Sequence, residues 1–195
     1  MTLPRLVFAT RNPGKVKEIA QLLDGHFTVV GLDEIGCHED VPETADTIAG
    51  NAIQKAEYVK QHYNVDCFAD DTGLEVSALN GAPGVYTARY AGPEKDANAN
   101  MDKLLGALQG QPDRGARFKT VIALTSDQGT QTFEGICRGT IAMRRSGVDG
   151  FGYDPVFMPE ESEATFAEME ASEKNRISHR GKAVRAMVAK LKNNG

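Results

Sequence analysis

The strongest constraint on this chain lies near its N-terminus, where an apolar run at 6–9 stops at Thr10 and Asn12-Pro13 follows. The next apolar residues recur at helical spacing, at Val16, Ile19, Leu22 and Leu23. Asn is a preferred N-cap, and Pro is tolerated at the first helical position because its missing N–H would be unpaired there anyway. The segment therefore predicts a strand that leads directly into the N-terminus of a helix.

A turn of this kind favours anions, because the first helical amides have no partner within the helix and the helix dipole is positive there. Thr10, Asn12 and Lys15 add a hydroxyl, a side-chain amide and a positive charge at the same place. The turn lacks the two-glycine spacing of a P-loop, since Gly14 is its only glycine. The pattern indicates a phosphate site, and the alternative is an ordinary N-cap with a solvated lysine.

Strand and helix patterns alternate along the rest of the chain. Further strands are expected at 28–30, 66–69, 74–79, 118–124, 132–143 and 155–158. Further helices are expected at 47–62, 97–108 and 178–191. Because strands and helices interleave, and 118–143 has the pattern of an antiparallel hairpin, the predicted fold is α/β with a mixed sheet. A length of 195 residues corresponds to one domain, 1–195.

Two consecutive acids, Asp70 and Asp71, follow the apolar strand expected at 66–69. Successive side chains of an extended segment point to opposite sides, so the two carboxylates cannot do the same job. One could bind a hard cation such as Mg²⁺, which prefers oxygen ligands, while the other orients or deprotonates a water. The alternative is a pair of turn aspartates that close the strand before Gly73.

Glu43 lies just before the helix expected at 47–62, and Lys55 lies on that helix. Glu43 is either an acid that stabilises the positive end of the helix dipole or a further metal ligand, and local sequence does not decide between them. Lysines are mostly exposed, so Lys55 is expected at the surface.

The loop Gly150-Phe151-Gly152-Tyr153-Asp154-Pro155 carries two aromatic rings, each preceded by a glycine. Such rings can hold a flat base by stacking, which contributes about 1–3 kcal/mol per base. The residue before a proline is biased toward an extended conformation, so Asp154 is expected to be extended. The alternative is a turn whose aromatic side chains plug the core.

Positively charged residues also occur at Lys174 and at the start of the last expected helix. Ser178 is the predicted N-cap of that helix, which places His179 and Arg180 in its first turn. A cation in the first turn opposes the helix dipole, so Arg180 requires an acceptor nearby. Its guanidinium has only donors and would suit the keto oxygen of a purine such as hypoxanthine. The alternatives are a surface position for His179 and a salt bridge to an acid for Arg180.

Composition limits the partners of the chain. A net charge of −5 argues against broad binding of duplex nucleic acid, which needs a basic face. Three widely spaced cysteines suggest neither a disulfide framework nor a zinc site, and no apolar run approaches the ~20 residues of a membrane span. The expected location is the cytoplasm, and the expected partner is a small anionic ligand.

The motifs occur together and in order, and as a set the chain resembles the inosine triphosphate pyrophosphatase family, also called the Ham1 family. The motifs that carry the resemblance are Thr10-Arg11-Asn12-Pro13-Gly14-Lys15, Glu43 ahead of Asn51-Ala52, Ala69-Asp70-Asp71-Thr72-Gly73-Leu74, Gly81-Ala82-Pro83-Gly84 with Ala88-Arg89-Tyr90, Gly150-Phe151-Gly152-Tyr153-Asp154-Pro155 and Ile177-Ser178-His179-Arg180-Gly181. The resemblance covers Leu6 to Leu191. It implies a homodimeric, Mg²⁺-dependent α/β enzyme with a long mixed sheet flanked by helices and a central nucleotide-binding cleft between two lobes.

The resemblance also implies an activity, the hydrolysis of dITP, ITP and XTP to the monophosphate and pyrophosphate, which keeps deaminated purines out of DNA and RNA. The residues implied to bind substrate are Thr10, Arg11, Asn12, Pro13, Gly14, Lys15, Thr72, Phe151, Gly152, Tyr153, Asp154, Lys174, His179 and Arg180. The implied catalytic residues are Asp71 as proton acceptor, Asp70 as its support, and Lys15 and Lys55 at the phosphates. The implied metal ligands are Glu43 and Asp71.

The chain departs from the family pattern at a few positions. Gly50 stands where the family usually has an acid, and no role is assigned to it. Thr72 replaces a common Ser, Thr87 replaces the Ser of the usual Ser-Ala-Arg segment, and Tyr153 stands where some relatives carry Trp. Two other functions stay open: a related pyrophosphatase acting on modified pyrimidine nucleotides, and a regulator that binds purine triphosphates without cleaving them.

Overall fold

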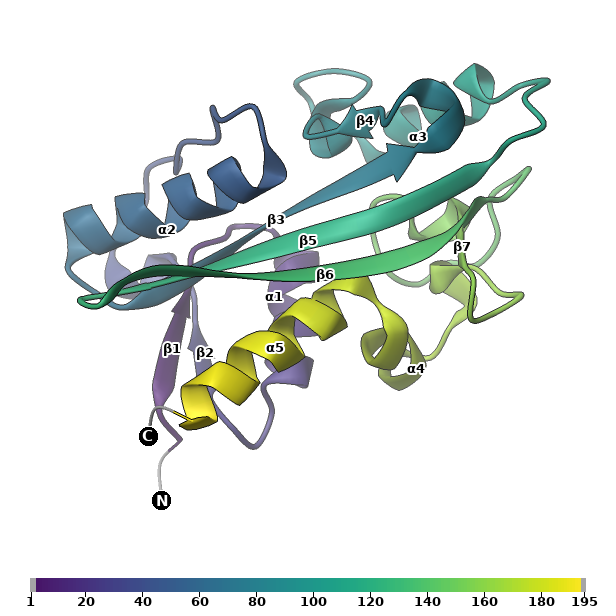
Figure 1. Ribbon diagram of the computed structural model, residues 1–195. Helices are drawn as coiled ribbons and strands as arrows, with labels where there is room; N and C mark the ends of the chain where they lie inside the picture. The colour runs from purple at the N-terminus through teal and green to yellow at the C-terminus, as the bar shows by residue number, and fades with distance from the viewer. Residues whose placement is uncertain (1–2, 194–195) are drawn as a thin grey trace. The chain divides into compact units, whose positions relative to one another are not determined.

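The computed structural model of the chain describes residues 3–193 and contains interleaved strands and helices (Figure 1). The strands are β1 (Arg5–Phe8), β2 (Thr28–Val30), β3 (Cys67–Val76), β4 (Pro83–Gly84), β5 (Gly115–Ser126), β6 (Gly129–Ile141) and β7 (Phe157–Pro159). The α-helices are α1 (Pro13–Leu22), α2 (Ile48–Tyr63), α3 (Ala97–Ala107), α4 (Ala171–Ile177) and α5 (His179–Asn193). The α/β class predicted from the sequence is confirmed.

The strands form a mixed sheet. Within the described residues, hydrogen-bonded neighbours follow the order β2-β1-β3-β5-β6-β7, and β4 pairs with β3. Strand β1 runs parallel to both β2 and β3, whereas the β3–β4 and β6–β7 pairs are antiparallel. Two residues connect β5 to β6, which is the length of a tight hairpin turn. Both hairpin strands are longer than the sequence pattern predicts.

The chain divides into two compact units. The described part of unit 1 comprises residues 3–71, 120–135 and 180–193, and unit 2 comprises 72–119 and 136–179. Strands β3, β5 and β6 each contribute residues to both units, and the chain passes from unit 1 to unit 2 directly after Asp71. It returns to unit 1 for residues 120–135 and finally between His179 and Arg180.

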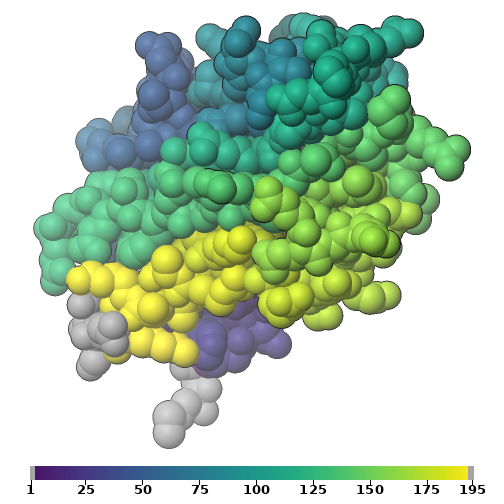
Figure 2. Space-filling view, turned by 45° about the vertical axis from the view of Figure 1, so that its right-hand side comes forward, coloured from purple at the N-terminus to yellow at the C-terminus, as the bar shows by residue number. Residues whose placement is uncertain are grey.

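The strands of unit 1 bury side chains on both faces of the sheet. Alternate side chains of β1, β3 and β5, among them Ala69, pack with α2 in one buried cluster. The intervening side chains, among them Phe8 and Phe68, pack with residues of α1 and α5 in a second cluster. Period-two alternation therefore assigns Asp70 to the face of Phe68 and Asp71 to the face of Ala69. Figure 2 shows the outer side of α5, in yellow, with the purple N-terminal part of unit 1 beside it.

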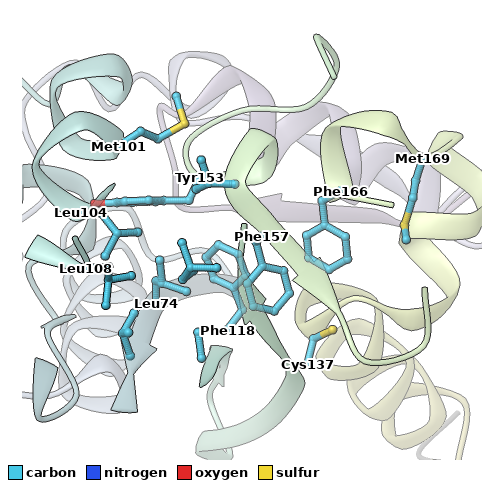
Figure 3. Close-up of a cluster of buried hydrophobic side chains, with 14 of the residues drawn as sticks. Leu74, Met101, Leu104, Leu108, Phe118, Cys137, Tyr153, Phe157, Phe166 and Met169 are labelled. Atoms are coloured by element: carbon cyan, nitrogen blue, oxygen red, sulfur yellow. The ribbon is translucent and has the colours of Figure 1, made fainter. Parts of the chain in front are cut away.

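Unit 2 has its own core, drawn in Figure 3. Aliphatic side chains surround a group of packed aromatic rings, in which the ring of Phe118 lies 4.7 Å from that of Phe157, centroid to centroid. Tyr153 belongs to the same cluster, and its ring reaches toward Leu104. All three cysteines of the chain, Cys37, Cys67 and Cys137, are buried. Burial raises the pKa of the Cys67 thiol to about 12.

Three expectations about elements are wrong. The strands expected at 66–69 and 74–79 are one strand, β3, which passes through the two acids, and 3₁₀ geometry follows at Ser77–Leu79. A 3₁₀ turn at Asp154–Val156 replaces the extended conformation expected before Pro155 and shortens the final strand. Helix α4 was not expected, because seven residues are too few for a clear 3.6-residue period. No helix of the described residues is long and apolar enough to cross a membrane.

Candidate functional site

The turn after β1 has the predicted geometry. Asn12 is the N-cap of α1, and its side-chain oxygen accepts a hydrogen bond from the Lys15 amide at 3.1 Å. The backbone N–H of Asn12 in turn donates to Thr10 Oγ1 at 3.2 Å. Lys15 is not solvated, because its Nζ lies 2.9 Å from Asp70 Oδ1 and its side chain is only 13% exposed. The turn thus presents a helix N-terminus and a fixed ammonium group together.

Arg11 takes a different part from the other residues of this turn. Its guanidinium donates to Asp33 Oδ1 at 2.9 Å and to the backbone oxygens of Cys37 and Glu39 at 2.6 and 3.2 Å. The side chain therefore ties the turn after β1 to the segment 33–39. Pro13 and Gly14 complete the turn as the first residues of α1.

Asp70 is fully buried and surrounded by cations. Besides Lys15, it accepts a hydrogen bond from Arg180 Nε at 3.2 Å, and Arg180 is itself 2% exposed and bonded to Glu18. Burial alone would raise the pKa of Asp70, but the charges of Lys15 and Arg180 outweigh it and hold that pKa well below its ordinary value. Asp70 is therefore ionised at neutral pH. The acceptor that Arg180 requires is this acid, as the salt-bridge alternative predicts.

Asp71 has separate partners on the opposite face of β3. Asn51 Nδ2 donates to its Oδ2 at 3.3 Å, and Lys55 Nζ lies 3.7 Å from its Oδ1. Burial raises the pKa of Asp71 above its ordinary value, with Asp70 and Glu43 adding to the effect and the lysines opposing it. The two neighbouring carboxylates therefore have different surroundings: Asp70 forms ion pairs with Lys15 and Arg180, whereas Asp71 accepts from Asn51 and has a raised pKa. Their separate jobs stay a prediction.

Lys55 is buried, so the expectation of a surface lysine is wrong. It is 5% exposed, and its Nζ lies 2.6 Å from Glu43 Oε1. Burial opposes its charge, but Asp71 and Glu43 together raise the pKa of Lys55. Two carboxylates thus converge on one cation inside unit 1, which is why this lysine can be buried at all.

Glu43 and Asp71 are the residues that could hold a metal ion. No three His, Cys, Asp or Glu residues in the described part of the chain gather into a closed metal site. An open pair of carboxylates suits Mg²⁺, which is usually bound through one or two carboxylates, water and substrate phosphates. Both carboxylates already face one cation, Lys55, so their donor chemistry and charge fit such an ion.

The aromatic loop of unit 2 is organised by a buried ion pair. Asp154 Oδ2 accepts hydrogen bonds from Lys174 Nζ at 2.6 Å and from the Phe151 amide at 2.8 Å. A Cβ on Gly150 would lie 2.1 Å from the same oxygen, and its φ is +77°, so glycine is required there on both counts. Lys174 Nζ also lies 5.3 Å from the centre of the Phe151 ring. Phe151 and Gly152 remain half-buried.

Tyr153 and His179 are core residues. Tyr153 lies among the core side chains of unit 2 (Figure 3) and is 3% exposed, and its hydroxyl donates to the backbone oxygen of Thr87 at 2.9 Å. It therefore plugs the core, as the alternative interpretation holds. His179 is 3% exposed and stacks on Phe118 at 4.5 Å, so the expected surface position is wrong. Thr72, the first residue of unit 2 after the acids, is half-buried on β3.

Sequence reasoning missed two residues that contact the acids or their partners. Glu18 lies three residues after Lys15, on the same side of α1, and binds Arg180. Asn51 lies on α2 among buried residues such as Ile48 and Ala52, and a polar residue at helical spacing from apolar ones is the signal that could have found it. Each was overlooked because its partner is distant in sequence.

Comparison with known proteins identifies relatives of nearly the same length. Residues 6–190 match the model of the Ham1 family. The dITP/XTP pyrophosphatase of Porphyromonas gingivalis is 57% identical, and the match covers 93% of this chain and 94% of that protein. The corresponding protein of Christiangramia forsetii is 55% identical, covering 96% and 98%. The structure of the Staphylococcus aureus Ham1 protein is similar with a TM-score of 0.88 at 40% identity, covering 98% and 100%.

Proposed function

The chain belongs to the Ham1 family, and we propose that it hydrolyses the deaminated purine nucleoside triphosphates dITP, ITP and XTP to the monophosphate and pyrophosphate. One observation carries the proposal: Asp70 and Asp71 lie on opposite faces of one strand, each within reach of a lysine. A lysine held at a helix N-terminus can stabilise negative charge on phosphates, and a carboxylate can accept a proton from water, and phosphoanhydride hydrolysis uses both functions.

In the proposed reaction, Asp71 accepts a proton from the water that attacks the α-phosphorus. The new bond joins the water oxygen to that phosphorus, and the bond from the α-phosphorus to the bridging oxygen breaks, so that pyrophosphate leaves. In the metal-free chain, burial raises the pKa of Asp71 above its ordinary value, and Asn51 and Lys55 lie beside its carboxylate oxygens.

Positive groups stabilise the charge that builds up on the phosphates. Lys15 and the N-terminus of α1 face the triphosphate, and Asp70 holds the Lys15 ammonium in place. Lys55 adds a second cation beside Asp71. Mg²⁺, held by Glu43 and Asp71, would supply further charge at the phosphate oxygens and lower the pKa of a bound water.

The base is assigned to the loop around Phe151. Its half-buried ring would stack on the purine, while Lys174 beside that ring would donate to a keto oxygen. Tyr153 acts from the core, where its hydroxyl anchors the loop to Thr87. Arg180 acts chiefly through its ion pairs with Asp70 and Glu18, which occupy its guanidinium inside unit 1.

The test is a panel of nucleoside triphosphates with separate assays for pyrophosphate and orthophosphate. We expect pyrophosphate from ITP, dITP and XTP, and far less from ATP, CTP and UTP. Turnover mainly of methylated pyrimidine triphosphates would favour the pyrimidine alternative. Tight binding of ITP without pyrophosphate release in the presence of Mg²⁺ would favour the regulator.

We also propose that the enzyme requires Mg²⁺, acts as a homodimer and works in the cytoplasm. Chelation by EDTA should abolish turnover, and added Mg²⁺ should restore it. Light scattering coupled to size-exclusion chromatography should give about twice the monomer mass of 21.1 kDa, and the monomer mass would contradict the dimer.

A further inference from the structure

Asn51 is a buried amide on α2 to which no role has been assigned. It is 2% exposed, and both ends of its side chain are engaged. Its Oδ1 accepts from the Ala45 amide at 2.9 Å, and its Nδ2 donates to Asp71 Oδ2 at 3.3 Å. A backbone N–H can only donate and a carboxylate can only accept, so the two partners fix which way the amide points.

The next turn of α2 repeats this pattern with a charged residue. Lys55 follows Asn51 by four residues and therefore lies on the same face of the helix. Its Nζ bonds Glu43 at 2.6 Å and lies 3.7 Å from Asp71. Each of the two side chains thus joins the segment 43–45 to Asp71. Asn51 does so without a net charge, so its contribution is one of geometry.

Other contacts hold the segment 43–45 close to the helix without reaching Asp71. The Thr44 amide donates to Gln54 Oε1 and Gln54 Nε2 donates to Thr44 Oγ1, both at 2.8 Å. A Cβ on Gly50 would lie 2.7 Å from Ala45 Cβ, so the absence of a side chain there lets the segment pack against α2. Gln54 therefore offers a control that loosens the same segment without touching the acid.

We propose that Asn51 is a positioning residue for the hydrolytic reaction. Its amide fixes the rotation of the Asp71 carboxyl group and ties that group to the backbone two residues beyond Glu43. The inference rests on the proposed function, in which Asp71 is the proton acceptor. A misplaced acceptor slows the chemical step more than it weakens substrate binding, because the triphosphate contacts other groups.

The first experiment compares kcat and KM for ITP in Asn51→Asp and Gln54→Ala. Asn51→Asp keeps an acceptor for Ala45 but replaces the donor to Asp71 by a carboxylate. We expect kcat to fall about 10–100-fold, with KM changed less than about threefold. Gln54→Ala should keep kcat within about threefold of the wild type. Should Asn51→Asp fail to fold, Asn51→Ser, which removes both contacts without adding charge, should show the same split.

A second experiment measures the contact without any activity assay. Thermal unfolding is followed for Asn51→Asp, Asp71→Asn and the double variant, which reverses the donor and the acceptor. Repulsion of two carboxylates lowers the Tm of Asn51→Asp. The Tm of the double variant should be about 2–4 °C higher than the value expected if the two single changes in Tm were additive. Circular dichroism provides the readout, and the folded fraction at 25 °C serves as the control for the kinetic arm.

The outcomes are separable. Additive Tm changes, or a kcat for Asn51→Asp within threefold of the wild type, would overturn the positioning role. A loss in Gln54→Ala as large as that in Asn51→Asp would also overturn it, since order of the segment would then explain both. A wild-type protein that releases no pyrophosphate from ITP would overturn the proposed function and with it the positioning role of Asn51 in that reaction, whereas the unfolding cycle would still report the contact.

Discussion

Replacement of Arg180 by Met separates two roles for this residue. The guanidinium is 2% exposed and bonds Asp70, which is fully buried, and Glu18, whose side chain is 13% exposed. Met retains much of the apolar volume of the arginine stem but none of its five donors. The substitution Arg180→Met therefore removes the ion pairs with a minimal change in packing.

The expected loss of stability follows from what each acid retains. Breaking a buried ion pair by removing one partner costs about 3–5 kcal/mol when an uncompensated charge remains. Asp70 still has Lys15 at 2.9 Å, and Glu18 still reaches water, so the cost should lie near the lower bound, about 3 kcal/mol. For a chain of this length, that loss lowers Tm by roughly 6–12 °C.

The assay combines urea and thermal unfolding with kinetics on two deaminated purine triphosphates and on ATP. The control is Arg185→Met, at an exposed position of the same helix, which should change stability by less than about 0.5 kcal/mol. We expect kcat/KM of Arg180→Met to fall by similar factors on all substrates, because the proposed function assigns Lys15, held by Asp70, to the triphosphate that all of them share. A Tm within about 2 °C of the wild type, together with a loss confined to ITP and XTP, would refute this reasoning and favour contact with the keto oxygen.

Three further predictions follow from other contacts. Asp71→Asn should remain folded while turnover of ITP falls at least about 100-fold, and near-normal turnover would disprove its role as proton acceptor. Glu39, whose pKa is lowered to about 2 chiefly by the Tyr63 hydroxyl, stabilises the fold fully above its unfolded pKa of 4.5, and that stabilisation is lost as pH falls toward 2. In urea titrations, the difference in unfolding free energy between wild type and Tyr63→Phe should thus be constant above pH 5 and should shrink as pH falls from 4.5 to 2. A difference that stays constant down to pH 2 would contradict this prediction. Gly50→Ala should lower Tm and kcat although alanine favours helix, because its Cβ would lie 2.7 Å from that of Ala45, and a raised Tm would show that the segment yields.

Local chemistry predicted the elements whose ends are set by their own residues. The Asn12 cap and Pro13 define the start of α1 as expected, and β2 has the expected bounds. In contrast, the end of the strand expected at Asp70 is absent. Two adjacent acids suggested a turn, but cations from distant parts of the chain allow Asp70 to stay buried within β3. Lys15 and Arg180 neutralise this buried acid from positions 55 residues before and 110 residues after it.

The sequence indicated which residue types gather near the acids, but it predicted the burial of their side chains less well. The acids and Lys15 meet within unit 1, but the burial of Lys55 depends on two carboxylates that no local pattern connects to it. The ring of Tyr153 could have belonged to a ligand pocket or to the core, and the hydrogen bond to Thr87, 66 residues earlier, decides for the core. Tertiary partners of this kind determine solvent exposure, which a single sequence does not encode locally.

The buried thiols have a practical consequence for work on this enzyme in solution. The thiolate reacts with maleimides, and a thiol with a pKa of about 12, such as Cys67, is almost wholly protonated at neutral pH. The other two cysteines are no more than 2% exposed. A cysteine introduced at Val148, which is 96% exposed, should therefore take up a fluorophore selectively and leave the native residues unmodified. The wild-type chain thus serves as its own background for site-specific labelling.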